Sequence, residues 1–343
     1  MKNIIYVSSI LFVLFPFDGN TQDIHFAQFD KSPLMLNPGL TGAIYKTQAN
    51  LNYRNQWTSV DSPFQTYAVS VDQRIRTKNK SGFLALGVYA LSDNAASTIK
   101  TVDLKVNIAG HVKINRNSTI GLGIQGGLLQ RTIDPSRFQW GSQYDGNNYN
   151  SAISNAEGST YNSVKAVDIS TGLVYSYSAN EYHKVTGNND KILNFGVSVS
   201  HINRPSISFV GSEEVLPIKV TVFANSLYSL PNSILAIGPS LMYSRQLAAR
   251  EVLIGTRFRY LLQEASKVTG FHGESAASIG FYYRHKDAII ALLQYEMLNY
   301  TIGFSYDLNI SKLSSMSNLR GGFELSLRYA APAPFGKNSV RFR

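Results

Sequence analysis

The sequence contains no cysteine, and only 16% of its 343 residues are charged. The missing cysteine excludes disulfides, zinc–cysteine centres, thiol nucleophiles and a lipid-modified N-terminal cysteine. No apolar run reaches the roughly 18 residues that a membrane-spanning helix needs, which excludes a polytopic helical membrane protein. What the sequence has instead is 20 Tyr and 18 Phe against 2 Trp. Low charge combined with many aromatic residues favours a folded, β-rich chain over a disordered one.

Residues 1–21 have the pattern of an export signal. Lys2 is followed by an apolar stretch over residues 4–17 and then by the polar run 18–21. This order predicts that a signal peptide is removed and that the mature chain begins near Gln22. A buried N-terminal helix is the alternative interpretation.

The formal net charge is +10, from 32 Lys and Arg against 22 Asp and Glu. The basic residues are dispersed, with no dense basic run interleaved with aromatics, so nucleic acid is not expected as a partner. Outer-membrane lipid and lipopolysaccharide, or an acidic protein surface, fit the excess of positive charge better. A diffusely solvated basic surface would explain it equally well.

Apolar and polar residues alternate with period two in segment after segment, as they do in strands whose two faces meet different surroundings. In residues 101–110, Val102, Leu104 and Val106 share one face, while Asp103 and Lys105 share the other. The pattern predicts about fourteen strands, near residues 50–54, 67–74, 83–90, 101–110, 120–125, 167–177, 193–200, 218–223, 234–243, 252–260, 277–284, 288–295, 300–307 and 322–329.

These strands indicate an all-β fold, a transmembrane antiparallel β-barrel of about 14 strands in the outer membrane, which we place over residues 49–330. An exported β-sandwich or propeller would also alternate. The sequence lacks the blade repeat of a propeller, and it has more apolar faces than a two-sheet core could bury. The barrel is therefore the favoured interpretation.

Strand parity predicts an orientation, because both ends of an even-stranded barrel lie on the periplasmic side and connections after odd strands then face outward. The two long outward connections, over residues 132–166 and 201–217, become candidate partner-contact loops. Their candidate residues are Trp140, Tyr144, Tyr149, His201, Arg204 and Pro205. The inward links 178–192 and 262–276 are longer than tight turns, which leaves open that one strand is misassigned.

The sequence shows no zinc-peptidase, nucleophile-elbow or P-loop motif, so we expect no catalytic, cofactor or metal site. A barrel hydrolase remains a remote alternative, on the strength of Ser97 with Lys100 and of the segment 272–275. The charges expected inside the barrel could line a pore or could pair across it; they are Asp72, Arg74, Asp103, Lys105, Arg257, Arg259, Arg284, Asp307, Glu324 and Arg328.

Several blocks resemble the PorP/SprF family of outer-membrane proteins of the type IX secretion and gliding-motility apparatus. The segments QDIHFAQF (22–29), PLMLNPGLTG (33–42) and YRNQW (53–57) resemble the start of that family, and matching pieces continue to SYD at 305–307. The family often ends in Cys-Pro-Arg-Phe, whereas this chain keeps only Arg-Phe near its end, which puts in doubt any contact made by the periplasmic tail 331–343.

The resemblance implies a non-enzymatic barrel of about fourteen strands that helps a secreted adhesin or other type IX cargo reach or stay on the cell surface. It also implies partners in the periplasmic ring or among peptidoglycan-linked lipoproteins. The alternative, from the same architecture, is an outer-membrane diffusion channel or small-solute transporter.

Residues 22–48 fit neither strand nor helix periodicity, and Pro33 and Pro38 interrupt any ladder. We predict that this segment plugs the barrel, with a turn at Asn37-Pro38; a flexible periplasmic leader is the alternative. The motif residues assigned to the plug are Asp23, His25, Phe26, Gln28, Phe29, Leu36, Asn37, Pro38 and Gly42. A second group, Tyr53, Arg54, Asn55, Gln56 and Trp57, is expected at the rim of the first strand, as an aromatic belt with a hydrogen-bonded arginine or as a cargo contact.

Overall fold

The structure is a computed structural model that describes residues 23–56, 63–75, 81–96, 98–134, 138–154, 163–179, 191–209, 214–263, 275–311 and 320–331. The expected signal peptide, Trp57 and residues 332–343 of the expected tail lie outside these ranges.

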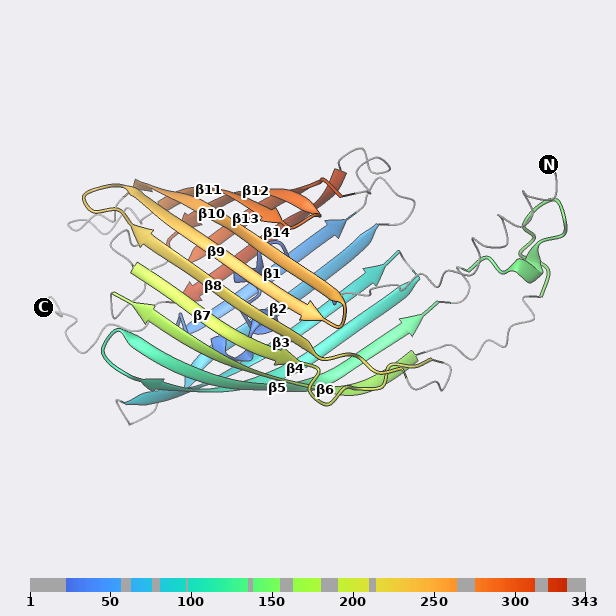
Figure 1. The fold of residues 1–343 in the computed structure, drawn as a ribbon, viewed down its shortest axis with the longest axis horizontal. Helices are drawn as coiled ribbons and strands as arrows, with labels where there is room; N and C mark the ends of the chain where they lie inside the picture. The colour runs from blue at the N-terminus through green and yellow to red at the C-terminus, as the bar shows by residue number, and fades with distance from the viewer. Residues whose placement is uncertain are drawn as a thin grey trace, which may run out of the picture.

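Fourteen antiparallel strands form one closed barrel in which each strand pairs with its neighbours in sequence and β1 pairs with β14 (Figure 1). The predicted all-β barrel is confirmed, with a strand at each predicted position. The strands are β1 (Thr47–Gln56), β2 (Phe64–Ile75), β3 (Gly82–Ala95), β4 (Ile99–Lys113), β5 (Ser118–Ile133), β6 (Ser163–Ser178), β7 (Lys191–Ser200), β8 (Lys219–Ser229), β9 (Leu235–Gln246), β10 (Ala249–Gln263), β11 (Ser275–Arg284), β12 (Ala288–Met297), β13 (Tyr300–Asn309) and β14 (Arg320–Ala331).

The two faces of each strand meet different surroundings. On β4, Val106 and Ile108 are 55% and 57% exposed, whereas Asn107 between them is fully buried. The outside of the barrel therefore carries apolar side chains, and the inside carries amides, hydroxyls and charges. An apolar exterior around a polar lumen is the arrangement of a membrane-spanning barrel. In the described part of the chain, no helix has the length and hydropathy to cross a membrane.

The barrel has two ends, which we name by the course of β1. The proximal end is where β1 begins at Thr47 and β14 finishes at Ala331; the distal end is where β1 finishes at Gln56. Odd-numbered strands run toward the distal end. The sequences between β6 and β7 and between β10 and β11 are long, yet all fourteen predicted strands are present among the described residues, so this length does not reflect a misassigned strand.

Residues 23–46, which we call the inner segment, lie within the barrel before β1 begins (Figure 1). They form three short helical turns, η2 (Phe29–Lys31), α2 (Pro33–Leu36) and η3 (Pro38–Leu40). Pro33 and Pro38 each start a turn, where a missing backbone N–H costs nothing. The Asn37 side chain accepts a hydrogen bond from the Gly39 N–H and caps η3.

Apolar side chains of the inner segment pack against the few apolar residues of the inner wall. Phe29, Leu36 and Leu40 share one buried cluster with Phe223 and Ile290. A second cluster joins Phe26 and Leu34 to Tyr89 and Leu91 of β3. The inner segment therefore has a specific packed position against several strands.

A charge placed on the outer face tests the membrane position of the barrel. We expect Val106→Arg, at the middle of β4, to destabilise the folded barrel by about 2–4 kcal/mol, because the guanidinium would lie at the depth of the lipid midplane. Val112→Arg, near the end of the same strand, should cost only about 0–1 kcal/mol. Urea titration in lipid vesicles measures both; equal costs for the two variants would contradict the assignment.

Candidate functional site: the lumen and its inner segment

The inner segment begins at the distal end, where Asp23 contacts residues of β8, of β9 and of the connection that follows β7. The Nε2 atom of His201 lies 2.7 Å from Oδ2 of Asp23, and its Nδ1 atom lies 2.9 Å from Oδ1 of Asp168 on β6. The Asp23 N–H donates to Oε1 of Gln246 at 3.1 Å. One imidazole therefore joins the start of the inner segment to the barrel wall.

Further charges surround this histidine. Nζ of Lys105 lies 2.7 Å from Asp168 and 2.9 Å from Asp103, and Nζ of Lys219 lies 3.9 Å from Asp23. With His201 protonated, three carboxylates face three cations. Burial alone would lower the pKa of His201, but its hydrogen bonds to Asp168 and Asp23 outweigh burial and raise that pKa above the ordinary value. Burial opposes ionisation of Asp23, yet His201 and Lys219 hold the pKa of this carboxyl well below its usual range.

These directions predict how pH affects the distal attachment. Because the pKa of His201 is raised by folding, its contribution is complete below the unfolded value of about 6.5 and is lost as pH rises through the higher folded value. We expect amide protection of residues 24–27 to fall as pH rises through the folded pKa of His201. Hydrogen-exchange protection factors, corrected for intrinsic rates at each pH, measure the effect. His201→Asn should remove the pH dependence, and a dependence that persists in this variant would contradict the assignment.

A second charge network holds the next part of the inner segment. Nε of Arg54 on β1 lies 3.1 Å from Glu324 on β14, and its Nη2 lies 3.4 Å from Asp307 on β13. Glu324 accepts the backbone N–H groups of Ala27 and Gln28 at 2.7 and 3.0 Å. Arg54 also donates to the backbone carbonyl of the inner segment at residue 25.

This second network extends across the lumen. Nη2 of Arg284 on β11 lies 2.9 Å from Asp307, and its Nε lies 3.5 Å from Glu251 on β10. His25 lies 3.7 Å from the same Glu251. The inner-face charges of β1, β10, β11, β13 and β14 thus pair with one another and with the inner segment, one of the two arrangements that the sequence left open.

The Asn37-Pro38 turn is held against the opposite wall. Nδ2 of Asn37 donates to the carbonyls of Leu173 on β6 and Val197 on β7, at 3.1 and 3.0 Å. Asn37 is fully buried. Gly123 and Gly172 let the backbone approach this closely, because a Cβ at Gly172 would lie 2.0 Å from Oδ1 of Asn37.

Gly172→Ala is therefore expected to displace the Asn37-Pro38 turn, since a methyl group cannot share that space. The exchange of amides 34–41 should rise at least about tenfold, the equivalent of about 1.4 kcal/mol. Gly126→Ala on β5, whose Cβ would meet nothing within 4 Å, is the matched control and should leave exchange unchanged. Unchanged protection in both variants would contradict the tight seating of this turn.

The inner segment reaches the proximal end at Gly42. This glycine has φ +65°, a left-handed conformation that favours glycine. A Cβ atom added to Gly42 would lie 2.5 Å from the Cβ atom of Ala85. Its N–H donates to Oδ2 of Asp72 at 2.7 Å. Arg74 donates to the carbonyls of Gly42, Ala43 and Ile44 at 2.5, 2.8 and 3.1 Å. Both ends of the inner segment are thus bound to strands.

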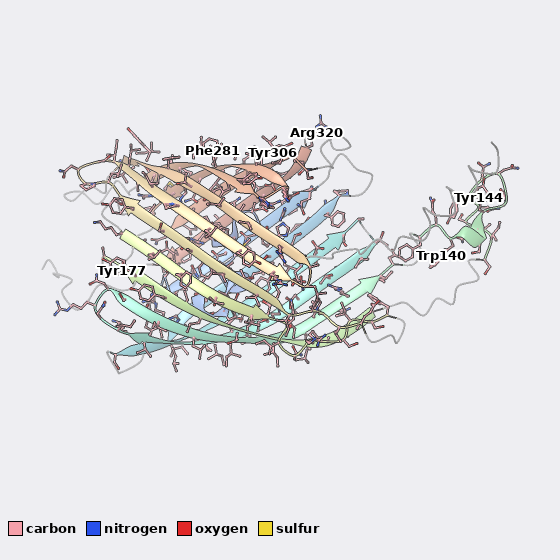
Figure 2. All side chains as sticks on the ribbon, in the orientation of Figure 1. Trp140, Tyr144, Tyr177, Phe281, Tyr306 and Arg320 are labelled. Carbon is pink, nitrogen blue, oxygen red and sulfur yellow. The ribbon has the colours of Figure 1, made fainter. Side chains whose placement is uncertain are left out.

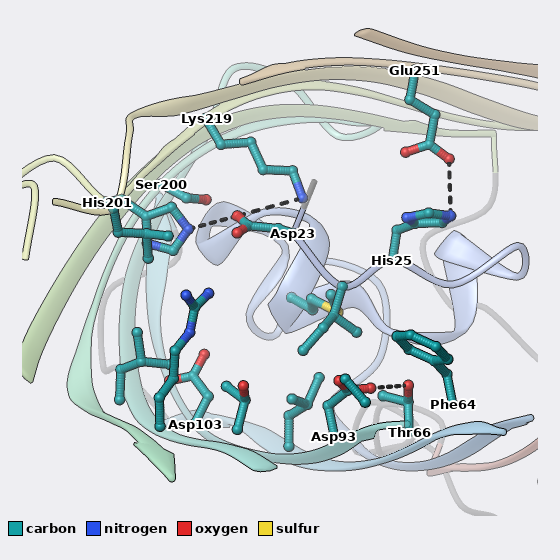
Figure 3. A pocket seen from close by; sticks show the side chains of 18 of the residues that line it. Asp23, His25, Phe64, Thr66, Asp93, Asp103, Ser200, His201, Lys219 and Glu251 are labelled. Carbon is teal, nitrogen blue, oxygen red and sulfur yellow. Dashed lines mark hydrogen bonds and ion pairs between the residues drawn. The ribbon is translucent and has the colours of Figure 1, made fainter. Parts of the chain in front are cut away.

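A cavity of about 660 Å³ lies between the inner segment and the distal mouth (Figure 3). Asp23 and His25 line it from the inner segment, and Asp93, Asp103 and Glu251 line it from the strands. Its charged lining is balanced, with five carboxylates (Asp23, Asp93, Asp103, Glu251, Asp287) and five Lys or Arg (Lys105, Arg131, Lys219, Arg250, Arg284). The cavity has the volume of a ligand pocket, but its base is closed by the inner segment.

The sequence-selected residues fall into three places. All the motif residues of the expected plug lie in the inner segment, and Asp23, His25, Gln28, Asn37 and Gly42 have contacts to the wall. In the rim group, Arg54 is only 1% exposed and lies in the lumen, while the rings of Tyr53 and Phe323 pack 5.8 Å apart. Asn55 donates to the Tyr53 hydroxyl, and Gln56 lines the distal cavity.

The loop group divides as well. Trp140 and Tyr144 lie on the β5–β6 connection, which extends beyond the barrel (Figure 2), and Tyr144 and Tyr149 are exposed. Asp145 accepts the N–H groups of Asn147 and Asn148, and these bonds lower its pKa. His201, in contrast, is buried in the distal charge cluster. On the β7–β8 connection, which begins at His201, Arg204 is exposed and Pro205 is buried.

Sequence reasoning missed Asp168 and Glu251. Their position on the inner faces of β6 and β10 was readable from the alternation, but their partners lie far away in the chain. In the described ranges, no group of three His, Asp or Glu side chains has the arrangement of a metal site. Ser97 and residues 272–274, on which the hydrolase alternative depended, lie outside those ranges.

This chain is similar to one protein family and to several solved structures. A model of the family described as type IX secretion system membrane protein PorP/SprF matches residues 18–329. No protein of curated function matches the chain. Among solved structures, the Ralstonia pickettii toluene transporter TbuX is similar at 11% identity and TM-score 0.46, over 89% of this chain and 94% of the other. BamA from Haemophilus ducreyi is similar at 10% identity and TM-score 0.43, over 83% and 70% of the two chains. These two likenesses concern the barrel fold alone.

Proposed function

This chain belongs to the PorP/SprF family of type IX secretion system membrane proteins, and from that premise we propose that it is a closed, non-enzymatic outer-membrane barrel. In this proposal the barrel helps translocate, dock or display a cognate secreted surface protein such as an adhesin. The observation that carries the proposal is the inner segment, which is bonded to the wall from Asp23 to Ile44. A lumen held shut in this way suits a scaffold that presents its loops.

The proposal includes an orientation. The distal end faces outward and the proximal end faces the periplasm, where ring components or peptidoglycan-linked lipoproteins of the system are the expected partners. Export by the signal peptide over residues 1–21 belongs to the same proposal. The exposed Tyr144 and Tyr149 and the half-buried Trp140 then project toward the cargo, as expected of aromatic contacts at interfaces.

The alternative function is an outer-membrane diffusion channel or small-solute transporter, and the distal cavity is the observation that favours it. A channel would require the inner segment to leave its hydrogen bonds before solute could pass. Planar-bilayer recording separates the two, because a steady open conductance of the native protein would favour the channel.

The experiment for the proposed function combines gene deletion with crosslinking. We expect deletion to reduce the amount of one large surface protein on the cells. A photo-crosslinking residue at Tyr144 should capture that protein, whereas one at Phe258, an exposed residue on the outer face of β10, should not. An unchanged surface proteome together with no adduct at Tyr144 would refute the proposal.

A further inference from the structure

The proximal mouth contains a second hollow with a different charge. This crevice, of about 90 Å³, lies between the end of the inner segment, at Ala43 and Ile44, and the wall from β2 to β7. Its charged lining residues are Arg74, Lys113 and Arg116, and no carboxylate lines it. The distal cavity, by comparison, is lined by as many carboxylates as Lys or Arg residues, together with three histidines. Of these two hollows, as lined by the described residues, the proximal crevice is the one whose lining has Lys and Arg without carboxylates.

Two of the three cations, Lys113 and Arg116, have no ion-pair partner among the described residues, whereas Arg74 lies near the carboxylate of Asp72. Arg74 donates to three backbone carbonyls, and its charge is partly balanced by the nearby Asp72. Its guanidinium also lies over the ring of Phe83, 4.4 Å from the ring centre. Lys113 and Arg116 are exposed at the end of β4 and in the turn that follows, and neither forms an ion pair in the described part of the chain.

The remaining lining supplies hydrogen-bonding groups around these charges. Asn117, Thr119, Ser176 and Asn194 line the crevice, together with Tyr177 at the proximal end of β6 (Figure 2). Positive charge next to amide and hydroxyl groups is the chemistry that binds oxyanions, and guanidinium groups fit them with two parallel hydrogen bonds.

We propose that the proximal crevice is a binding site for a single oxyanion group, either a phosphate or a carboxylate. The volume of the crevice suits one such group and is too small for a folded peptide. In the orientation proposed above, the crevice opens to the periplasm.

Calorimetric titration of the purified, detergent-solubilised mature chain tests this site. One arm uses sodium phosphate and the other sodium acetate, each against sodium chloride at equal ionic strength. The crevice variant Lys113→Gln/Arg116→Gln removes two exposed cations and leaves Arg74, which holds the inner segment, in place. The control variant Lys100→Gln/Lys165→Gln removes two exposed cations at the distal end.

We expect saturable binding of at least one anion, weakened at least about tenfold in the crevice variant and unchanged in the control, as the loss of two charge-assisted contacts implies. Binding of phosphate alone identifies a phosphate source, and binding of acetate alone a carboxylate source. Absence of saturable binding to the native protein, or equal affinity in the crevice variant, overturns the proposal. Because the titration uses purified protein, its outcome does not depend on whether the barrel serves secretion.

Discussion

Deletion of residues 23–42 is expected to convert a barrel with background conductance into a steadily open pore. The deletion removes the helical turns η2, α2 and η3 and the groups that bond to Asp72, Glu324 and His201. It leaves β1 intact from Thr47 onward. The interior that remains is lined by polar residues such as Asn50, Ser70 and Gln125, which would retain water as the lumens of larger open barrels do.

Planar-bilayer recording measures this change, and a heat-modifiable shift on gel electrophoresis shows whether the barrel has folded. Deletion of residues 141–150 is the control, because it also shortens the chain but removes residues that lie outside the lumen. This control should remain at background. A folded 23–42 deletion that stays silent would show that the inner segment is not what closes the lumen.

Replacement of Arg54 should produce the largest loss of stability from a single substitution. Arg54 is 1% exposed and lies between Glu324 and Asp307. In Arg54→Met, the carboxylate of Glu324 would be left buried without its cation, and removal of one partner from such a buried pair costs about 3–5 kcal/mol. Since Glu324 also binds the backbone of Ala27 and Gln28, we expect the inner segment to loosen and brief conductance events to appear.

The double variant Arg54→Met/Glu324→Gln separates charge from packing. It removes both partners of the pair, so it should be more stable than Arg54→Met alone even though it carries one more change. Urea unfolding in lipid vesicles gives the free energies of unfolding. A cost below about 1 kcal/mol for Arg54→Met would indicate an interaction no stronger than an exposed surface pair.

The strands were predictable from the sequence because their signal is local. Alternation along β4, from Val102 to Ile108, depends only on which residues meet lipid and which meet the lumen, and the same rule applies to every strand. The alternation of side chains along β1 also carried information that the prediction of a rim position for residues 53–57 did not use. Arg54 shares its face with Asn50 and Asn52, and this places it in the lumen, where it contacts Glu324 on the neighbouring strand β14.

The contacts of the inner segment could not be predicted in the same way. Gln28 bonds to Ser305 and Ser326, and Asn37 bonds to two carbonyls on β6 and β7. Each of these contacts joins residues that are distant in the chain, and nothing local specifies which strand a given polar group will meet. The irregular spacing of apolar residues over 22–48 indicated a segment that is neither strand nor amphipathic helix. It did not indicate the three helical turns.

The first and last strands both bind the inner segment, through Arg54 of β1 and Glu324 of β14. These two strands also form the seam whose pairing completes the cylinder. Insertion of the segment after that seam had closed would require folded turns to pass through a finished ring. We therefore expect the order of assembly to be fixed. Residues 23–42 pack against the forming hairpins first, and β1 then pairs with β14 around them.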